Sequence, residues 1–326
     1  MYAWYRSRPE TKGSEPTDGP ITERHVAAFL VSRRLDPDDL ETVSESVSHA
    51  QRTADGAGWV LGIDGATTAS LFLDRGREGP ETEGEGKLEP EPEPEPEPEL
   101  VWYVEIPHST LEEWDDPEST VRDAFPVTCE AVGSPAGVDR ELLVHAVNPE
   151  RPRRVATEET PLEASDPAAD RTVDVDLVRM TLESGLPERL ADRFAGLSRR
   201  VIAGDLTLGP IETWSAEMLD AETMYTESVF LERRADGYSL VGYMEAEEMQ
   251  RVYDAYYDTW NPVARASEIV LGWVLTDPAT ILEYPLETDV ELLAHAAHPD
   301  RPRRVSECGG AALDPDRTTE SDLEEE

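Results

Sequence analysis

The sequence predicts an α+β fold made of two tandem copies of one unit, and two observations lead to this prediction. The stretch "ELLVHAVNPERPRRV" (Glu141–Val155) returns 150 residues later as "ELLAHAAHPDRPRRV" (Glu291–Val305), with eleven identities in fifteen positions. Earlier in each copy, "TTASLFLDR" and "LVWYVEI" (67–75 and 100–106) match "YTESVFLER" and "LVGYMEA" (225–233 and 240–246). Self-similarity of this kind indicates a duplicated supersecondary unit.

Each copy begins with a β-rich run followed by a helix. The runs are "RHVAAFLVSR" (24–33) and "VDVDLVRMTL" (173–182). Pro37 and Pro187 then mark helix starts, because proline in the first turn costs no hydrogen bond. Two more strands follow as a hairpin, which in the second copy turns at "RRADGYS", where Asp-Gly between apolar runs is a strong hairpin signal.

A second helix and a closing strand complete each copy. In the second copy the helix is expected over 246–260, where apolar residues recur at helical spacing. Its counterpart begins at "HSTLEEW", where Ser109 and Glu112 have capping-box spacing. The order strand, helix, strand, strand, helix, strand is the ferredoxin-like split βαβ motif. Two such sheets can cover each other's open faces as an internal pseudo-dimer, an α/β barrel of about eight strands.

The expected layout places the domain boundary well after the repeated Glu-Pro pairs of 89–98. That run lies between strands that match a short hairpin in the second copy, so it is interpreted as a hairpin insertion, extended because proline recurs at every second position. The expected segments are a disordered N-terminus (1–20), the first repeat (21–155) with its insertion (76–99), a linker (156–172), the second repeat (173–305) and an acidic disordered tail (306–326).

The charge restricts the class of protein. Asp and Glu number 71 against 29 Lys and Arg, a formal net charge of −42, and Lys12 and Lys87 are the only lysines. Such a surface repels itself in dilute buffer, whereas at about 1 M salt the Debye length is only about 3 Å. We therefore expect a halophilic protein. The charge opposes binding to nucleic acid or to an anionic membrane, and without an apolar leader or membrane span the expected location is the cytoplasm.

Cysteine and histidine give little support for a metal or cofactor. The two cysteines, Cys129 and Cys308, are too few for a disulfide framework or a zinc cluster. His295 and His298 are three residues apart and lack a third close ligand. The sequence therefore predicts no metal and no cofactor.

The candidate site residues are those that both copies keep. Tyr103 and Glu105 correspond to Tyr243 and Glu245, and His145 corresponds to His295. Tyrosine and glutamate two apart on a strand point to one face of the sheet. A phenol, a carboxylate and an imidazole facing one cavity can transfer protons on a small molecule. Shared duplication history or a common fold requirement explains the same identities equally simply.

The second copy alone carries three further candidates. Arg179, Tyr225 and Glu227 stand where the first copy has Phe29, Thr67 and Ala69. A pocket is therefore expected in the second copy, with His295, Glu227 and Tyr243 as catalytic candidates and with Glu227 and His295 as an acid/base pair. The ligand-binding candidates are Arg179, Tyr225, Glu245, His145 and Tyr103. The two "RPRRV" segments are expected to be extended tails, whose arginines make surface ion pairs worth about 0–1 kcal/mol.

The second copy also resembles a haloarchaeal domain family of unknown function, whose members resemble dimeric α/β-barrel proteins. The likeness rests on "MYTESVFLER" (224–233), "LVGYMEAEEMQRVYDAY" (240–256) and "ELLAHAAHPDRP" (291–302). It implies no catalytic residues, because the family has none defined. The wider barrel superfamily includes monooxygenases, isomerases, haem enzymes and proteins without activity, so the fold does not decide the function.

Two functions remain open from the sequence. One is a non-catalytic or small-ligand-binding protein that is a monomer with an internal pseudo-dimer and could assemble further. The other is a cofactor-independent monooxygenase or isomerase acting on a small molecule in the barrel of the second repeat. An enclosed pocket lined by His295, Tyr243 and Glu227 would favour the enzyme, whereas an interior filled by large apolar side chains would favour the structural interpretation.

Overall fold

A computed structural model provides the structure of the chain, and it describes most of both repeats. The Glu-Pro pairs before Glu97, the N-terminal 20 residues and the C-terminal tail lie outside the described residues. The described residues are 21–22, 26–53, 56–76, 97–129, 132–135, 138–148, 151–152, 155–156, 171–202, 223–235, 237–258, 261–286, 289–298 and 301.

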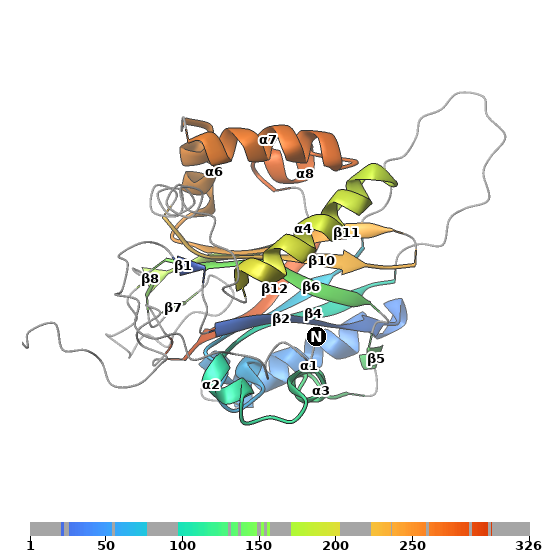
Figure 1. Cartoon of the computed structure of the whole chain (residues 1–326). Coiled ribbons are helices and arrows are strands. Elements are labelled where there is room, and N and C mark those ends of the chain that lie inside the picture. The colour runs from blue at the N-terminus through green and yellow to red at the C-terminus, as the bar shows by residue number, and fades with distance from the viewer. Residues whose placement is uncertain are drawn as a thin grey trace, which may run out of the picture.

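Two antiparallel five-stranded sheets form the centre of the molecule (Figure 1). Sheet A has the strand order β1 (Ile21–Thr22), β6 (Asp139–Val147), β10 (Met224–Arg233), β11 (Tyr238–Ala246), β9 (Asp174–Thr181). Sheet B has the order β12 (Val290–Ala297), β3 (Thr68–Asp74), β4 (Glu99–Pro107), β2 (Val26–Leu35), β5 (Val132–Pro135). The fold is therefore of the α+β class with curled antiparallel sheets.

The last long strand of each repeat lies in the sheet of the other repeat. Strand β6 pairs with β10, with His145 opposite Ser228, and β12 pairs with β3, with His295 opposite Ser70. The ferredoxin-like order of elements instead predicts that the closing strand of each repeat joins the sheet of its own repeat. In an isolated repeat, the outer edge of β10 or β3 would be exposed. The exchanged strand covers this edge with backbone hydrogen bonds.

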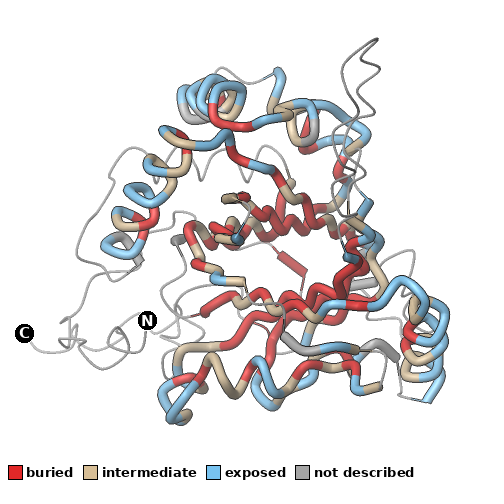
Figure 2. The backbone as a smooth tube through the Cα atoms, turned by 90° about the vertical axis from the view of Figure 1, so that its right-hand side faces the viewer, coloured by how far each residue is buried: buried red, intermediate tan, exposed pale blue. Residues whose placement is uncertain are grey.

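Helices cover the outer face of each sheet (Figure 1), and the strands that face each other across the space between the sheets are largely buried (Figure 2). Sheet B carries α1 (Leu40–Thr53), α2 (His108–Leu111) and α3 (Pro117–Asp123). Sheet A carries α4 (Leu186–Ile202), α6 (Met249–Asp258), α7 (Pro262–Val274) and α8 (Ala279–Leu282).

The proline-opened first helix of the first repeat is confirmed in detail. Pro37 begins a 3-10 turn (Pro37–Asp39) that leads into α1, and the Asp36 side chain accepts a hydrogen bond from the backbone N–H of Asp38. The expected capping box at Ser109 is wrong, because Pro107 precedes α2 and no side chain caps that helix. Helix α7 was not predicted, and its apolar sequence covers part of sheet A.

The hairpins follow the expected pairing. Strands β10 and β11 pair antiparallel across residues 234–237, and Gly237 has a φ of 152°, a conformation that favours glycine. Strands β3 and β4 pair in the same way, with Asp74 opposite Glu99, so residues 75–98 connect two neighbouring strands. The expected linker has paired ends, since β7 (Val155–Ala156) and β8 (Arg171–Thr172) form a short parallel pair.

Three apolar cores hold these layers together. One lies between sheet B and its helices around Trp102, and a second lies between sheet A and its helices around Met249. The third fills the space between the sheets with side chains from both, among them Phe72, Phe230 and Leu177. The interior is therefore occupied by large apolar residues along much of its length. No helix within the described residues is long and apolar enough to cross a membrane.

Candidate functional site

Ten polar side chains from both repeats meet in the space between the sheets, and we call them the interior polar cluster. None of them is more than 3% exposed. They come from the inward-facing positions of six strands and from the residues that follow β6 and β12. The members are Ser70, Tyr103, Glu105, His145, Arg151, Ser228, Tyr243, Glu245, His295 and Arg301.

Strand alternation and two register shifts place these side chains inside. Tyr103 and Glu105 follow Val101 at every second position of β4, and all three are fully buried. The register of β6 against β10 shifts between Val229 and Phe230, and that of β12 against β3 shifts between Leu292 and Ala294. A β-bulge re-aims the side chains that follow it, which brings each histidine onto the inward face.

Two Tyr–Ser–His groups stand at the centre, each built from both sheets. The Ser70 hydroxyl on sheet B lies 3.2 Å from the Tyr243 hydroxyl on sheet A and 2.8 Å from Nδ1 of His295. The Ser228 hydroxyl on sheet A lies 2.9 Å from the Tyr103 hydroxyl on sheet B and 2.8 Å from Nδ1 of His145. The two groups meet face to face, since the tyrosine rings stack at 3.5 Å between centroids.

Two buried ion pairs close one end of the interior. Arg301 donates to both carboxylate oxygens of Glu245 at 2.7 and 3.0 Å, and its Nε donates to the carbonyl oxygen of Pro152 at 2.7 Å. Arg151 donates to Glu105 at 3.0 and 3.2 Å, and the hydroxyl of Thr68 donates to the same carboxylate at 2.9 Å. The expectation of surface ion pairs is therefore wrong for these two arginines, which are fully buried.

The hydrogen-bond partners fix the proton positions in the group formed by Tyr103, Ser228 and His145. The Tyr103 hydroxyl donates to Oε1 of Glu105 at 3.1 Å, so it accepts from Ser228. The single Ser228 proton is then used, and Nδ1 of His145 carries the proton that it donates to Ser228. Nε2 of His145 is buried and has no hydrogen-bond partner within the part of the chain that the structure describes.

Burial sets the protonation states of the cluster. Burial lowers the pKa of His145 and of His295 to about 4, and it raises the pKa of Tyr103 and of Tyr243 well above the usual value. Burial alone would raise the pKa of Glu105, but Arg151 and the other charges and donors around the carboxylate together outweigh burial and hold this pKa at about 2. The cluster at neutral pH therefore combines neutral imidazoles, protonated phenols and ion-paired carboxylates, and none of these groups is poised to exchange a proton near pH 7.

Glu227 does not join the cluster. In the sheet it lies opposite Met244 and Ala146, which pack on the core beneath the helices, whereas its neighbour Ser228 faces the interior. The alternation of the strand thus sends Glu227 to the outer face of sheet A. The expected acid/base pair of Glu227 and His295 is therefore wrong, because the sheet separates the two side chains. Burial without a basic partner raises the pKa of the Glu227 carboxyl.

Arg179 lies at the other end of the interior, in an ionic group that links the two sheets. It contacts Asp74, and it lies 3.4 Å from Glu99 and 3.3 Å from Glu232. Arg140 and Arg234 pair with the same glutamates. Burial alone would raise the pKa of Glu232, but these arginines outweigh it and hold that pKa at about 2. Arg179 thus has carboxylate partners already. Tyr225 packs in the core between the sheets.

Sequence reasoning missed Ser70, Ser228, Arg151 and Arg301. The signal was present, because each of the four is identical in both copies: the serines within "TASLF" and "TESVF" and the arginines within "NPERP" and "HPDRP". Serine in a strand and arginine after one are individually ordinary. Their importance came from the exchange of β6 and β12, which the repeat alone does not indicate.

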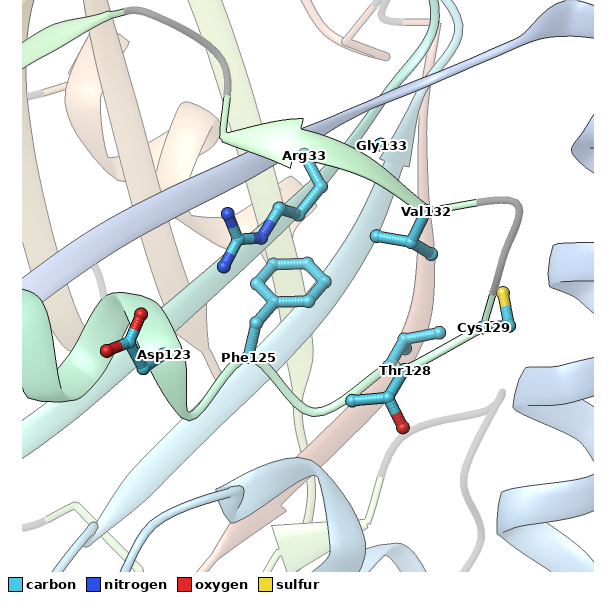
Figure 3. Close-up of a pocket in the computed structure, with 8 residues that line it drawn as sticks. Arg33, Asp123, Phe125, Thr128, Cys129, Val132 and Gly133 are labelled. Atoms are coloured by element: carbon cyan, nitrogen blue, oxygen red, sulfur yellow. The ribbon is translucent and has the colours of Figure 1, made fainter.

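A separate cleft of about 580 Å³ opens beside the outer face of sheet B (Figure 3). It lies between β2, β5 and the segment after α3. The Arg33 guanidinium lies 5.4 Å from the centroid of the Phe125 ring and donates to the carbonyl oxygen of Arg122 at 2.5 Å. Asp123 and the half-buried thiol Cys129 lie at the sides of the cleft. The cleft thus offers a cation, an aromatic face and a carboxylate.

Within the described residues, no group of three His, Cys, Asp or Glu side chains could hold a metal ion.

The comparisons with known proteins identify no family for this chain. No family model matches the chain, and no curated protein matches it. Among solved structures, a protein of Fusobacterium nucleatum described as a "putative monooxygenase" is similar over 84% of this chain and 91% of its own length. The TM-score is 0.36 and the identity is 5%. A similarity this distant carries no argument about activity.

Proposed function

We propose that this chain is a non-catalytic, small-ligand-binding protein adapted to a salt-rich cytoplasm. Its architecture is proposed to be an internal pseudo-dimer of two ferredoxin-like repeats around a shared barrel interior, related to the haloarchaeal domain family that it resembles. The matching strands of the two copies and the symmetrical exchange of β6 and β12 support this architecture. The net charge of −42 supports the adaptation to salt.

One observation carries the non-catalytic part of the proposal. The side chains best suited to catalysis, Tyr243 and His295, are both hydrogen-bonded to Ser70, at 3.2 and 2.8 Å, in an interior that large apolar side chains also fill. A substrate would have to displace stacked tyrosines and expose two buried ion pairs. Breaking a buried ion pair costs about 3–5 kcal/mol, which a small ligand would have to supply. The cluster thus fits the role of a polar core that fixes the register of the exchanged strands.

The cleft beside β2 and β5 is the proposed place for the ligand. Its volume of about 580 Å³ lies in the range of about 300–1,000 Å³ that small-molecule sites occupy. Arg33 favours a carboxylate or phosphate on the ligand, and the aromatic ring of Phe125, which lines the cleft, favours a flat apolar group beside it. A small aromatic or aliphatic acid is the ligand class that this lining fits.

A ligand screen by thermal shift at about 1 M KCl, where charge repulsion is screened, tests the proposal. Aromatic and aliphatic acids form the panel, and each stabilising compound is measured by calorimetry on the wild type, on Arg33→Gln and on Ser70→Ala. We expect Arg33→Gln to lose binding and Ser70→Ala to retain it. Loss of binding in folded Ser70→Ala with full binding in Arg33→Gln would place the ligand in the interior and contradict the proposal.

The alternative function is a cofactor-independent monooxygenase or isomerase, and one observation favours it. Glu227 is a carboxyl with a raised pKa on a mainly apolar face, whereas the equivalent Ala69 is fully buried in a packed core. Such a carboxyl is suited to proton transfer. Solvent deuterium exchange into small ketones, followed by NMR, tests this directly. Exchange that depends on protein and disappears in Glu227→Gln would establish the alternative, and equal exchange with and without protein would remove it.

A further inference from the structure

The first long helices of the two repeats, α1 and α4, carry opposite charge on the outside of the molecule. Each follows the first strand of its repeat, β2 or β9, and lies on the outer face of its own sheet. Figure 1 shows them on opposite sides of the pair of sheets, so they cannot contact each other within one molecule. Their different surfaces therefore face solvent in different directions.

Helix α1 and the turn before it present carboxylates. Residues 36–53 contain five acidic residues and one arginine. Asp38, Glu41 and Glu45 are exposed, and Glu41 and Glu45 lie on one side of the helix because they are four residues apart. This surface is acidic, like most of the chain.

Helix α4 is basic, unlike most of the chain. Residues 186–202 contain four arginines and two acidic residues. Arg189, Arg193 and Arg200 follow helical spacing along the exposed side, and none of the three has an ion pair with the described residues. Leu186, Phe194 and Leu197 lie among them and are 54, 48 and 37% exposed. The helix thus presents an Arg–Leu stripe on the outer side of sheet A.

We propose that the Arg–Leu stripe of α4 docks against the acidic α1 of a second copy of this chain. Charge complementarity favours this partner, because the exposed arginines of α4 can pair with the exposed carboxylates of α1. The two helices are also similar in length. An α-helix rises about 1.5 Å per residue, so α1 and α4 are about 21 and 25 Å long. Because α1 and α4 lie on opposite sides of the molecule (Figure 1), two copies cannot make both contacts about one two-fold axis, so the contact is heterologous and leads to a ring or to an open chain of copies.

The association is weak and depends on salt. Two helices make a contact smaller than a standard interface, so the dissociation constant lies between about 1 µM and 1 mM. In dilute buffer the charge of −42 on each copy opposes association. At about 1 M salt this long-range repulsion is screened, whereas the apolar contact of Leu186 and Leu197 persists. The contact therefore forms best in the salt-rich solution that the composition predicts.

Charge reversal tests this contact by sedimentation velocity of the full chain at about 1 M KCl. The first variant carries Arg189→Glu, Arg193→Glu and Arg200→Glu, and the second carries Glu41→Arg and Glu45→Arg. We expect each variant alone to bind itself at least tenfold more weakly than the wild type. An equimolar mixture should regain association, because the first variant keeps an acidic α1 and the second keeps a basic α4.

A matched control carries the same charge change elsewhere. Arg34, Arg75 and Arg251 are each more than half exposed, with side-chain exposures of 55, 51 and 58%, and their triple change to Glu should leave association within about twofold. Circular dichroism and thermal melts confirm that every variant is folded. A wild type that stays monomeric at about 1 mM overturns the proposal. A mixture that fails to associate, or a control that loses association as fully as the α4 variant, overturns it as well.

Discussion

The outer faces of sheets A and B carry different side chains, although the two repeats contribute the same side chains to the interior polar cluster. Beneath α1–α3, position 69 is an alanine with no exposed surface in a packed apolar core. Beneath α4–α8, the equivalent position is Glu227, and large apolar side chains such as Trp273 and Ile269 are 54 and 74% exposed on α7. Between the sheets, both repeats keep the same Tyr, Glu, Ser, His and Arg side chains. The repeats therefore differ beneath their helices, at positions such as 69 and 227, and are identical in the interior polar cluster, where side chains of both repeats meet.

Among these predictions, Ala69→Glu, compared with Glu227→Gln at the equivalent position, is expected to have the largest effect on the free energy of unfolding. Ala69→Glu buries a carboxyl in an apolar core without a partner, and should destabilise the fold by about 4–5 kcal/mol or more. Glu227→Gln should raise stability at neutral pH, because the folded state raises the pKa of Glu227 above its unfolded value. Ionisation then weakens the fold as the pH rises through that pKa, and the difference disappears below the unfolded pKa. Urea melts at several pH values measure both effects, and equal costs for both substitutions would remove the difference between the faces.

Removing Arg301 or Arg151 from the interior should lower the free energy of unfolding nearly as much as Ala69→Glu does. Arg301→Met leaves the Glu245 carboxylate buried and unpaired, and should cost about 3–5 kcal/mol. Arg151→Met should cost somewhat less, because Thr68 and Tyr103 also donate to Glu105. Adding Glu245→Leu to Arg301→Met should restore most of the loss. A loss below about 1 kcal/mol, the value of a surface pair, would contradict the buried pairing.

The two interior histidines should make stability sensitive to acid. Their pKa of about 4 in the fold lies below the ordinary 6.5, so the unfolded chain binds protons first as the pH falls. Stability is present above pH 6.5 and is lost between about pH 6.5 and 4, by about 2–3 kcal/mol for each histidine. His145→Asn and His295→Asn should each reduce the slope of unfolding free energy against pH in that window. Unchanged slopes would mean that the histidines are protonated or open to solvent in the fold.

The two serines should differ in a way that separates the two Tyr–Ser–His groups. Ser228→Ala leaves Nδ1–H of His145 without its acceptor but leaves the Tyr103 hydroxyl with its bond to Glu105, and should cost about 1–2 kcal/mol. Ser70→Ala removes the hydroxyl that pairs with Tyr243, and should cost about 1–3 kcal/mol. Thermal and urea melts compare them, with Ser46→Ala on the exposed side of α1 as a control. The reverse order would show that the Glu105 bond does not compensate.

Deleting the Glu-Pro run should have the smallest effect. Loop length costs little closure entropy, so removal of Glu89–Glu97 should leave the melting temperature almost unchanged. Removal of Glu89–Pro98 should lower it, because Pro98 is buried and its carbonyl oxygen accepts a hydrogen bond from the backbone N–H of Leu35 at 2.8 Å. The hairpin insertion therefore ends before Pro98, which belongs to the packed fold. A large effect of the shorter deletion would show that the run itself stabilises the fold.

The repeat is visible in the sequence itself, and its identities pick out several members of the interior polar cluster. The identities at Tyr243, His295 and Glu245 select residues that do meet in the structure, because side chains at the interface of two copies are constrained in both. Glu227 was grouped with them only because it is charged and belongs to the second copy. Strand alternation puts it on the other face, and that could have been inferred from its odd spacing relative to Ser228.

The sequence by itself determined the α+β class, the central hairpin of each copy and the acidic composition, because these follow from hydrophobic periodicity, turn residues and residue counts. Only the tertiary structure decided which sheet each closing strand joins. A strand carries the same local pattern whichever edge it pairs with, and the choice depends on contacts with residues more than 80 positions away, such as Ser228 with His145. That choice places Arg151 and Arg301 inside the molecule rather than on its surface.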